Sequence, residues 1–294
     1  MSSENFFLGV DGGGSKCKAR LVNAAGELLG EGIAGPANPF QNLELACDSI
    51  VEAAHRALSE AGMDDSAMGS LVAGAGLAGV NIPRFHQLMS QWAHPFAQLY
   101  LATDIHIACL GAHGGADGAV IVAGTGSVGY SSVAGVGTSF GAHGFPFGDK
   151  GSGAWLGLEA MKALLLAADD LGPATSLVEA VEKHLGVKGL DIIGAMARAT
   201  QRDYGALAPL VLTAATADDP VALGIVREGA DYLSDLAERL LASGVEEFCM
   251  LGGLSPKIMP WMRPQVIAKV VAPRGQPDEG AVSFTLGRYA QEQA

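Results

Sequence analysis

One stretch near the start of the chain combines an acid with a run of glycines. Asp11 follows an apolar run over residues 6–10. After it come five small or polar residues: Gly12, Gly13, Gly14, Ser15 and Lys16. Glycine has no Cβ, so backbone N–H groups can approach a ligand closely and form a concave anion site. A carboxylate beside a phosphate needs a divalent cation between them, as in kinases, so the stretch taken alone fits a Mg²⁺–phosphate site and an ordinary glycine hairpin equally well.

The same pattern of an apolar run and a glycine turn occurs twice more. The second turn consists of Gly124, Thr125, Gly126 and Ser127, and the third begins with Gly252 and Gly253. No single turn is specific, but three in this order, the first with an acid, form an unusual combination. They resemble the phosphate-1, phosphate-2 and adenosine segments of the sugar kinase, Hsp70 and actin superfamily, in which two duplicated lobes bind ATP.

Composition limits the classes of protein to consider. The chain has 294 residues, of which 49% are hydrophobic and 17% are charged, which is enough for two folded lobes with their own cores. A net charge of −13 argues against a nucleic-acid partner, because such a partner needs a basic surface. Residues 118–148 lack charged side chains but are interrupted by Gly, Ser and Thr, so they predict strands and no membrane span. No signal peptide is visible, and we expect a cytoplasmic protein.

The four cysteines offer no metal motif. Cys17, Cys47, Cys109 and Cys249 are far apart in the sequence and form no CxxC pair. We interpret them as reduced thiols, with metal or iron–sulfur binding as the alternative.

Two groups of strands and helices must position the glycine turns. In the first half we expect strands at 6–10, 17–22, 27–34, 71–79 and 98–102, with helices at 43–61, from 83, and at 105–113. The second half repeats the three-strand meander over 119–140. It continues with helices at 154–171, 176–185, 191–200, 206–217 and 221–241, a strand at 247–251, a helix at 258–262, a strand at 266–271 and a last helix at 278–289. This order predicts an α/β fold of two ribonuclease-H-like lobes, divided into residues 1–108 and 109–294, with the last helix, about 279–290, as a candidate to pack on the first lobe.

The motifs extend the resemblance to one family over nearly the whole chain. They are GVDGGGSK, GPANPF, GLAG, HPFAQLYLATD, CLGAH, VAGTGS, FGDKGSGAWLG and GGL. Together they resemble the N-acetylglucosamine and glucosamine kinases of the BadF/BadG/BcrA/BcrD ATPase family. The resemblance implies an actin-like ATPase fold with a cleft between the lobes, and ATP and Mg²⁺ bound there. It also implies phosphoryl transfer to the 6-hydroxyl of an amino sugar, with N-acetylglucosamine favoured and glucosamine as the alternative.

The resemblance also assigns roles to residues. All three glycine turns are expected at the nucleotide, with Gly253 and Leu254 covering adenine and Asp11 holding Mg²⁺ partly through water. Asp104 matches the catalytic carboxylate, which would accept the proton of the attacking hydroxyl. The competing interpretation is that Asp104 only caps the following helix. The sugar is expected at Asp104 itself and at four further positions: Asn38, Gly79, Gly148 and Asp149.

Several alternatives stay open in the sequence. Ala78 occupies a position where some relatives carry Ser, so the contacts to the group at carbon 2 are not defined. An ATPase activator of an acyl-CoA dehydratase or reductase would need an iron–sulfur cluster, and a sugar-sensing regulator would need a DNA-binding segment. A kinase acting on anhydro-muropeptide sugars is a fourth option. The sequence does not fix the oligomeric state, and a homodimer is kept as one option.

Overall fold

The computed structural model describes residues 6–294, which form two compact units. Unit 1 comprises the chain up to Gly118, together with Ala134–Gly137 and Pro273–Ala294. Unit 2 comprises Ala119–Val133 and Thr138–Ala272. Part of the N-terminal segment on which the absence of a signal peptide was predicted lies outside the described residues.

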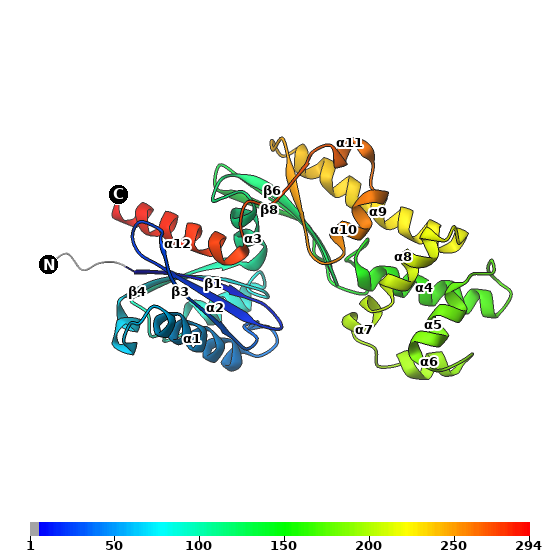
Figure 1. The fold of residues 1–294 in the computed structure, drawn as a ribbon, viewed down its shortest axis with the longest axis horizontal. Coiled ribbons are helices and arrows are strands. Elements are labelled where there is room, and N and C mark those ends of the chain that lie inside the picture. Colours follow the sequence, from blue (N-terminus) through cyan, green and yellow to red (C-terminus); the bar gives the residue numbers. More distant parts are fainter. Residues whose placement is uncertain (1–5) are drawn as a thin grey trace. The chain divides into compact units, whose positions relative to one another are not determined.

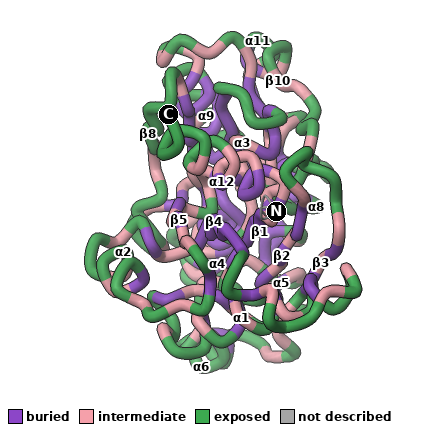
Figure 2. Tube along the Cα trace, turned by 90° about the vertical axis from the view of Figure 1, so that its left-hand side faces the viewer, coloured by how far each residue is buried: buried purple, intermediate pink, exposed green. Residues whose placement is uncertain are grey.

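The sheet of unit 1 has five strands in the order β3-β2-β1-β4-β5. They are β1 (Phe6–Gly12), β2 (Cys17–Val22), β3 (Leu28–Ala34), β4 (Leu71–Leu77) and β5 (Gln98–Thr103). The first three form an antiparallel meander, whereas β4 and β5 run parallel to β1. The carboxyl ends of β1, β4 and β5 therefore lie at one edge of the sheet. Strand β4, which lies between β1 and β5, is buried along its whole length (Figure 2).

Helices cover both faces of this sheet (Figure 1). They are α1 (Leu43–Glu60), the 3₁₀ helix η1 (Asp65–Ser70), α2 (Pro83–Ser90), α3 (Asp104–Ala112) and α12 (Pro277–Gln293). Glycines allow the close approach: a Cβ at Gly32 would lie 2.0 Å from the carbonyl of Ala53 in α1, and one at Gly9 would lie 2.5 Å from the backbone of Val282 in α12. The C-terminal helix therefore packs directly on the strand that carries Asp11.

A buried ion cluster fixes α12 to β2. Asp278 is 2% exposed, and its carboxylate accepts from Arg20 Nε at 2.8 Å and lies 3.1 Å from Lys18 Nζ. Burial alone would raise the pKa of Asp278, but hydrogen bonds from Arg20 and Lys18 hold it below its ordinary value. A buried carboxylate with two cationic partners is stabilised in its charged form. The cluster thereby fixes the start of α12 against β2.

Unit 2 contains a second five-stranded sheet with the order β10-β9-β6-β7-β8. The strands are β6 (Gly118–Ala123), β7 (Ser127–Val133), β8 (Val136–Gly141), β9 (Phe248–Leu251) and β10 (Val270–Val271). The helices are α4 (Gly153–Ala168), α5 (Leu177–Leu185), α6 (Asp191–Met196), α7 (Gln201–Gly205), α8 (Ala208–Thr216), α9 (Pro220–Leu241), α10 (Ser255–Ile258), the 3₁₀ helix η2 (Met259–Trp261) and α11 (Pro264–Ile267). Read from its other end, this order repeats that of unit 1. Strand β9 runs parallel to both of its neighbours, β6 and β10.

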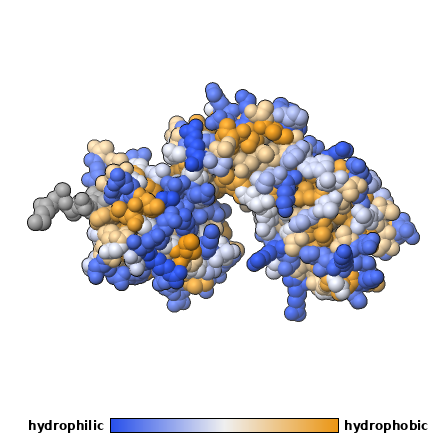
Figure 3. Space-filling model, in the orientation of Figure 1, coloured by the Kyte–Doolittle hydropathy of each residue, from blue (hydrophilic) through white to orange (hydrophobic). Residues whose placement is uncertain are grey.

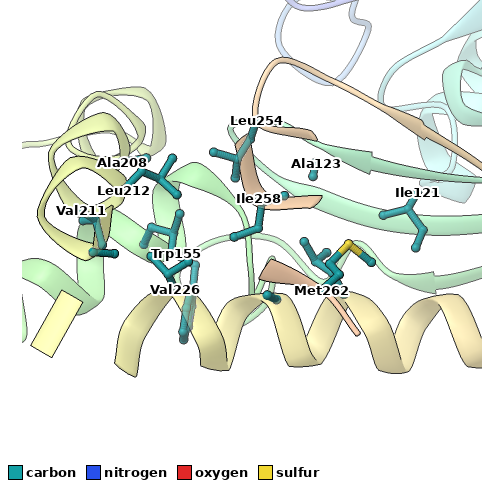
Figure 4. Close-up of a cluster of buried hydrophobic side chains, with 14 of the residues drawn as sticks. Ile121, Ala123, Trp155, Ala208, Val211, Leu212, Val226, Leu254, Ile258 and Met262 are labelled. Carbon is teal, nitrogen blue, oxygen red and sulfur yellow. The ribbon is translucent and has the colours of Figure 1, made fainter. Parts of the chain in front are cut away.

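The core of unit 2 lies between its sheet and these helices. Ile121 and Phe248 are fully buried, and they pack in one cluster with Trp155 of α4 and Val226 of α9 (Figure 4). Elsewhere, the face of the molecule in Figure 3 mixes hydrophilic surface with separate apolar patches. Among the described residues no single helix is long and apolar enough to cross a membrane, and only the bent pair 201–216 and 220–241 meets that length and composition jointly.

The predicted α/β fold with its duplicated strand order is confirmed, but three details differ. The expected helix at 206–217 is α8 alone, preceded by the unpredicted short helix α7. The expected strand at 266–271 is only β10, because Pro264 begins the helical turn α11. The units divide after Gly118, ten residues beyond the expected division, because all of α3 belongs to unit 1.

Candidate active site

The first glycine turn joins β1 to β2 and leaves backbone donors at its tip. The N–H of Gly13 donates to the carbonyl of Lys16 at 3.0 Å, which closes the turn. Gly14 and Ser15 at the tip are exposed, and their N–H groups donate to no other described residue. A Cβ at Gly13 would come no closer than 3.7 Å to any atom, whereas one at Gly12 would lie 2.5 Å from Leu77. Gly12 is therefore required by packing, and Gly13 leaves room for a ligand.

Asp11 stands at the base of this turn in an unfavourable electrostatic position. It lies opposite Lys18 in β2 and beside Gly76 in β4. The pKa of Asp11 is raised from 3.8 to about 6, chiefly by burial and further by the negative charges of Asp104 and Asp278. The positive charges of Lys16 and Lys18 oppose this rise. A cation at this carboxylate would offset that repulsion.

Asp104 begins α3 directly after the last residue of β5. Its side chain is exposed, and Oδ1 accepts from the N–H of Ile105 at 2.9 Å. Desolvation by the surrounding protein raises the pKa of Asp104 above its ordinary value, although hydrogen bonds from backbone N–H groups oppose the rise. The N-cap of α3 is Thr103, whose Oγ1 accepts from the N–H of His106 at 3.3 Å. Capping therefore belongs to Thr103, and the Asp104 carboxylate faces solvent as a proton acceptor would need to.

The predicted sugar residues of unit 1 form one small cluster. Asn38 Oδ1 accepts from the N–H of Phe40 at 3.0 Å, while its side-chain NH₂ donates to no described residue. Gly79 has φ +87°, and a Cβ there would lie 2.6 Å from Asn38 Oδ1, so only glycine fits. Phe40 is 59% exposed and meets Phe85 edge to face, with ring centroids 5.6 Å apart. The cluster offers a free amide donor beside an apolar ledge formed by Phe40 and Phe85.

The second glycine turn lies in unit 2 between β6 and β7. The N–H of Gly124 donates to the carbonyl of Gly126 at 2.9 Å, and the carbonyl of Gly124 accepts from Gly153 at 2.8 Å. No atom lies within 4 Å of the place where a Cβ on Gly124 would be. Thr125 at the tip is exposed, whereas the hydroxyl of Ser127 is buried and donates to the carbonyl of Lys150 at 2.8 Å. The turn therefore leaves open space beside Gly124, where no side chain lies.

Asp149 is tied to this turn from the other side. It is 7% exposed and has φ +59°, in the left-handed region that Asp tolerates better than most residues. Its Oδ2 accepts from Gln201 Nε2 at 2.9 Å, and a Cβ on Gly126 would lie 2.8 Å from the same oxygen. Burial raises its pKa, whereas hydrogen bonds from Gly144, Gln201 and Ser127 lower it. Gly148 precedes it in a tight loop, where a Cβ would lie 2.7 Å from His143 Cβ.

The third glycine segment completes a pocket in unit 2. Gly252 has φ +92°, and a Cβ there would lie 2.4 Å from the carbonyl of Ala123 at the end of β6. The N–H of Leu254 donates to that carbonyl at 3.0 Å, whereas a Cβ on Gly253 would meet nothing within 4 Å. The pocket holds about 270 Å³. Its lining is Gly124, Thr125, Gly153, Gly205, Ala208, Pro209, Leu212, Gly253, Leu254 and Lys257.

Each unit therefore brings together part of the predicted site. Unit 1 holds Asp11 and Asp104 in electrostatic contact, with Asn38 and Gly79 in one cluster. Unit 2 holds the second and third glycine turns around one pocket. Sequence reasoning missed Gln201 and Lys257, which lie in the short helices α7 and α10. It also missed Thr103 as the cap of α3, although a Thr before an Asp at a helix start is a capping signal.

The donor atoms for a metal ion are few. Among residues 6–294 no group of three or more His, Cys, Asp and Glu side chains is arranged to hold a metal. Mg²⁺ in kinases is held by one or two carboxylates together with phosphate oxygens and water. Asp11 beside a turn with free N–H groups fits this mode of binding, because the phosphate would supply the remaining ligands.

Comparison with known proteins places this chain in a family. The chain is 36% identical to glucosamine kinase GspK of Vibrio cholerae over 280 residues, which cover 95% of each protein. A crystal structure from Chromobacterium violaceum, of a protein proposed to be an N-acetylglucosamine kinase, superposes with a TM-score of 0.86 at 31% identity. That match covers 96% of this chain and 98% of the other.

Two further matches concern the fold and the family. The ROK hexokinase of Thermus thermophilus, at 19% identity and a TM-score of 0.51, shares the fold over 95% of this chain and 98% of its own. A family model described as BadF/BadG/BcrA/BcrD ATPase matches residues 8–283, which include all three glycine turns and both acids. The chain belongs to the BadF/BadG/BcrA/BcrD ATPase family.

Proposed function

We propose that this protein is an amino-sugar kinase that transfers the γ-phosphoryl group of ATP to the 6-hydroxyl of N-acetylglucosamine, with glucosamine as the alternative acceptor. The observation that carries the proposal is the acid pair of unit 1. Asp104 is exposed at the end of β5, and its charge acts on Asp11 at the base of a glycine turn. A relative 36% identical over 95% of both chains is a glucosamine kinase, which supports the same class of acceptor.

Asp104 acts as the general base in this proposal. It accepts the proton of the 6-hydroxyl as that oxygen attacks the γ-phosphorus, and the bond from phosphorus to the β-phosphate oxygen breaks. Its raised pKa suits this task, because a base whose pKa approaches the working pH takes up a proton more readily.

Asp11 and the glycine turns hold the phosphates. When bound, Mg²⁺ would neutralise charge on the phosphate oxygens, and Asp11 is the carboxylate that would hold it, partly through water. The N–H groups of Gly14 and Ser15 would donate to the oxygens of the terminal phosphates. Thr125 would contact the remaining phosphates, and the open space beside Gly124 would admit them.

Asn38, Gly148 and Asp149 orient the sugar. The free NH₂ of Asn38 would donate to a ring hydroxyl, and the carboxylate of Asp149 would accept from another. The ledge formed by Phe40 and Phe85 is apolar and beside Asn38, which suits the methyl group of an acetamide better than a charged amine. This ledge supports N-acetylglucosamine over glucosamine.

A panel of acceptors tests the proposal. The purified protein with ATP and Mg²⁺ should phosphorylate N-acetylglucosamine, glucosamine or both, with glucose at least tenfold lower in kcat/KM. Side-by-side kcat/KM values decide between the two amino sugars. Glucose used as well as either amino sugar would overturn the assignment, because the group at carbon 2 would then not be recognised.

A further inference from the structure

The loop between β3 and α1, residues 35–42, packs on the first glycine turn. The N–H of Ala37, which is fully buried, donates to the carbonyl of Gly13 at 2.9 Å. A Cβ on Gly12 would lie 2.9 Å from the carbonyl oxygen of Ala37, so the two backbones are in direct contact. The same loop carries Asn38, which the proposed function assigns to the sugar. Within unit 1 this loop therefore joins the phosphate turn to the sugar cluster.

Gln41 is the residue of this loop whose side chain reaches the tip of the turn. A Cβ on Gly14 would lie 3.1 Å from Gln41 Nε2 and 3.5 Å from Gln41 Oε1, so the side-chain amide lies directly beside the tip. The N–H groups of Gln41 and Asn42 both donate to the carbonyl of Asn38, at 3.0 and 3.1 Å. One turn of the chain thus holds Asn38 and Gln41 close together.

The Gln41 side chain takes no part in stabilising the loop or the helix that follows. It is exposed, and its amide makes no hydrogen bond with any residue between 6 and 294. The neighbouring Asn42 is the N-cap of α1, where its Oδ1 accepts from the N–H of Leu45 at 3.0 Å. Replacement of Gln41 should therefore leave the fold intact.

Free hydrogen-bond donors gather at this tip. They are the N–H groups of Gly14 and Ser15 and the side-chain NH₂ of Gln41, and Lys16 adds a positive charge next to them. An oxyanion can accept from several such donors at once. The phosphoryl group that is transferred must lie between the rest of the nucleotide and the sugar. Gln41 stands at that position within unit 1, because its amide is beside the phosphate turn and its loop carries Asn38.

We infer that Gln41 is a further substrate-binding residue whose side-chain NH₂ donates to the γ-phosphate of ATP, and that this contact helps the protein to distinguish ATP from ADP. The inference rests on the proposed function, which places ATP at the first glycine turn and the sugar at Asn38. ADP ends at the β-phosphate and leaves the Gln41 amide without a partner. The N–H groups of Gly14 and Ser15 can still donate to its oxygens.

The test compares nucleotides with and without the γ-phosphate. Calorimetric titration of the parent and of Gln41→Ala with AMPPNP and with ADP, each with Mg²⁺, gives four dissociation constants. Gln41→Ala should weaken AMPPNP by roughly three- to tenfold and change ADP by less than about twofold, because one net hydrogen bond is lost from AMPPNP alone. Equal weakening of both nucleotides would show that Gln41 only shapes the turn and would overturn the inference, as would unchanged binding of both.

A charge at the same position gives a second test. Gln41→Glu should weaken AMPPNP by roughly tenfold or more, and by more than it weakens ADP, because the carboxylate repels the additional phosphate. The matched control is Gln291→Glu, which makes the same change at an exposed residue of α12. That end of α12 contacts β5, where Tyr100 Oη donates to Glu292 at 2.9 Å, and no residue of the glycine turn lies there. The control should leave both constants unchanged, and the same loss in Gln291→Glu as in Gln41→Glu would overturn the inference.

The outcomes separate this inference from the proposed function. Phosphorylation of an amino sugar by the parent, with AMPPNP and ADP affected equally in Gln41→Ala, would overturn the inference alone. A selective loss of AMPPNP affinity in Gln41→Ala, with glucose used as well as any amino sugar, would support the inference and overturn the amino-sugar assignment. Failure of the parent to bind either nucleotide would overturn both.

Discussion

The two units carry the same strand order but different chemistry. In unit 1 the first strand brings Asp11 to its glycine turn, and the last strand is followed by Asp104. In unit 2 the first strand ends at Ala123, its turn begins with Gly124, and its last strand ends at Val271 without any acid. Unit 1 therefore has two carboxylates at its sheet edge, whereas unit 2 has the single buried carboxylate of Asp149 beside its turn and a pocket lined mainly by small and apolar residues with Thr125 and Lys257.

In the proposed function, this difference lets the same strand order hold the acids in one unit and the nucleotide pocket in the other. The carboxyl ends of parallel strands gather loops at one sheet edge in both units, which makes that edge a natural binding site. Repulsion between Asp11 and Asp104 suits a metal and a proton acceptor, but it would oppose a second set of phosphates. The second turn itself contains no acid, and the nearby Asp149 is buried and accepts from Gln201. The predictions below test this division, starting from the largest expected effect.

Replacement of Asp104 should have the largest effect. Asp104→Asn should lower kcat by roughly 10²–10⁴-fold, because the amide cannot accept the proton of the attacking hydroxyl. Binding of ATP, measured by titration, should stay unchanged, since the pocket of unit 2 is intact. The control is Thr103→Ala, which removes the cap of α3 at a cost of about 1 kcal/mol in stability but keeps the base. Turnover of Asp104→Asn within a few-fold of the parent would contradict the assigned role.

Asp11→Asn should stabilise the ligand-free protein while it impairs Mg²⁺-dependent ATP binding. The folded-state pKa of Asp11 is raised from 3.8 to about 6, so keeping this carboxylate ionised at pH 7 opposes folding by up to ~3 kcal/mol. That cost is present above pH 6 and disappears as the pH falls toward 4, where the parent side chain is protonated as well.

Thermal unfolding across pH measures this difference. The melting temperature of Asp11→Asn should exceed that of the parent at pH 7–8, and the two should converge near pH 4. Excess Mg²⁺ with ATP should raise the melting temperature of the parent far more than that of the variant. A variant that is less stable than the parent at pH 7 would show that Asp11 is not held in an unfavourable position.

How far the sequence predicts this division depends on how local the signals are. Apolar runs broken by glycines predict β1, β2 and β6 with their turns, since strand ends and tight turns are determined by neighbouring residues. The contact between Gln201 and Asp149 joins residues 52 apart, and Gln201 begins a helix of only five residues. No local sequence pattern predicts such a contact. The contribution of α8 to the pocket lining is unpredictable from the sequence for the same reason.

Asp149 should matter for the sugar and not for the nucleotide, although it touches the second glycine turn. Asp149→Asn keeps a side chain that tolerates the left-handed backbone but loses the charged acceptor. The KM for the sugar should rise by about 5- to 150-fold, which corresponds to ~1–3 kcal/mol for an unpaired hydrogen-bonding group, while the KM for ATP changes little. Gln201→Ala should raise the sugar KM by a smaller factor, because it only positions the carboxylate. An equal rise in both KM values would place Asp149 at the nucleotide.

The smallest expected effect separates glycines that face a ligand from glycines required by packing. Gly124→Ala places a methyl group where the structure has no atom within 4 Å, so the fold should be unaffected. In the nucleotide-bound protein the same methyl would lie where backbone must meet phosphate, and ATP affinity should fall by roughly tenfold. Gly13→Ala is the matching change in unit 1, where the nearest atom is 3.7 Å away, and it should behave alike.

Gly12→Ala provides the opposite case. Its Cβ would lie 2.5 Å from Leu77, so this change should lower the melting temperature whether or not nucleotide is present. Melting curves and ATP titrations of the three variants therefore make one experiment. If Gly124→Ala keeps full ATP affinity while Gly13→Ala loses it, phosphate recognition would belong to unit 1 alone, and the division between an acidic unit and a nucleotide unit would have to be redrawn. Loss of affinity in both would mean that each unit contributes a phosphate turn, with Asp11 and Asp104 in the first unit and Asp149 in the second.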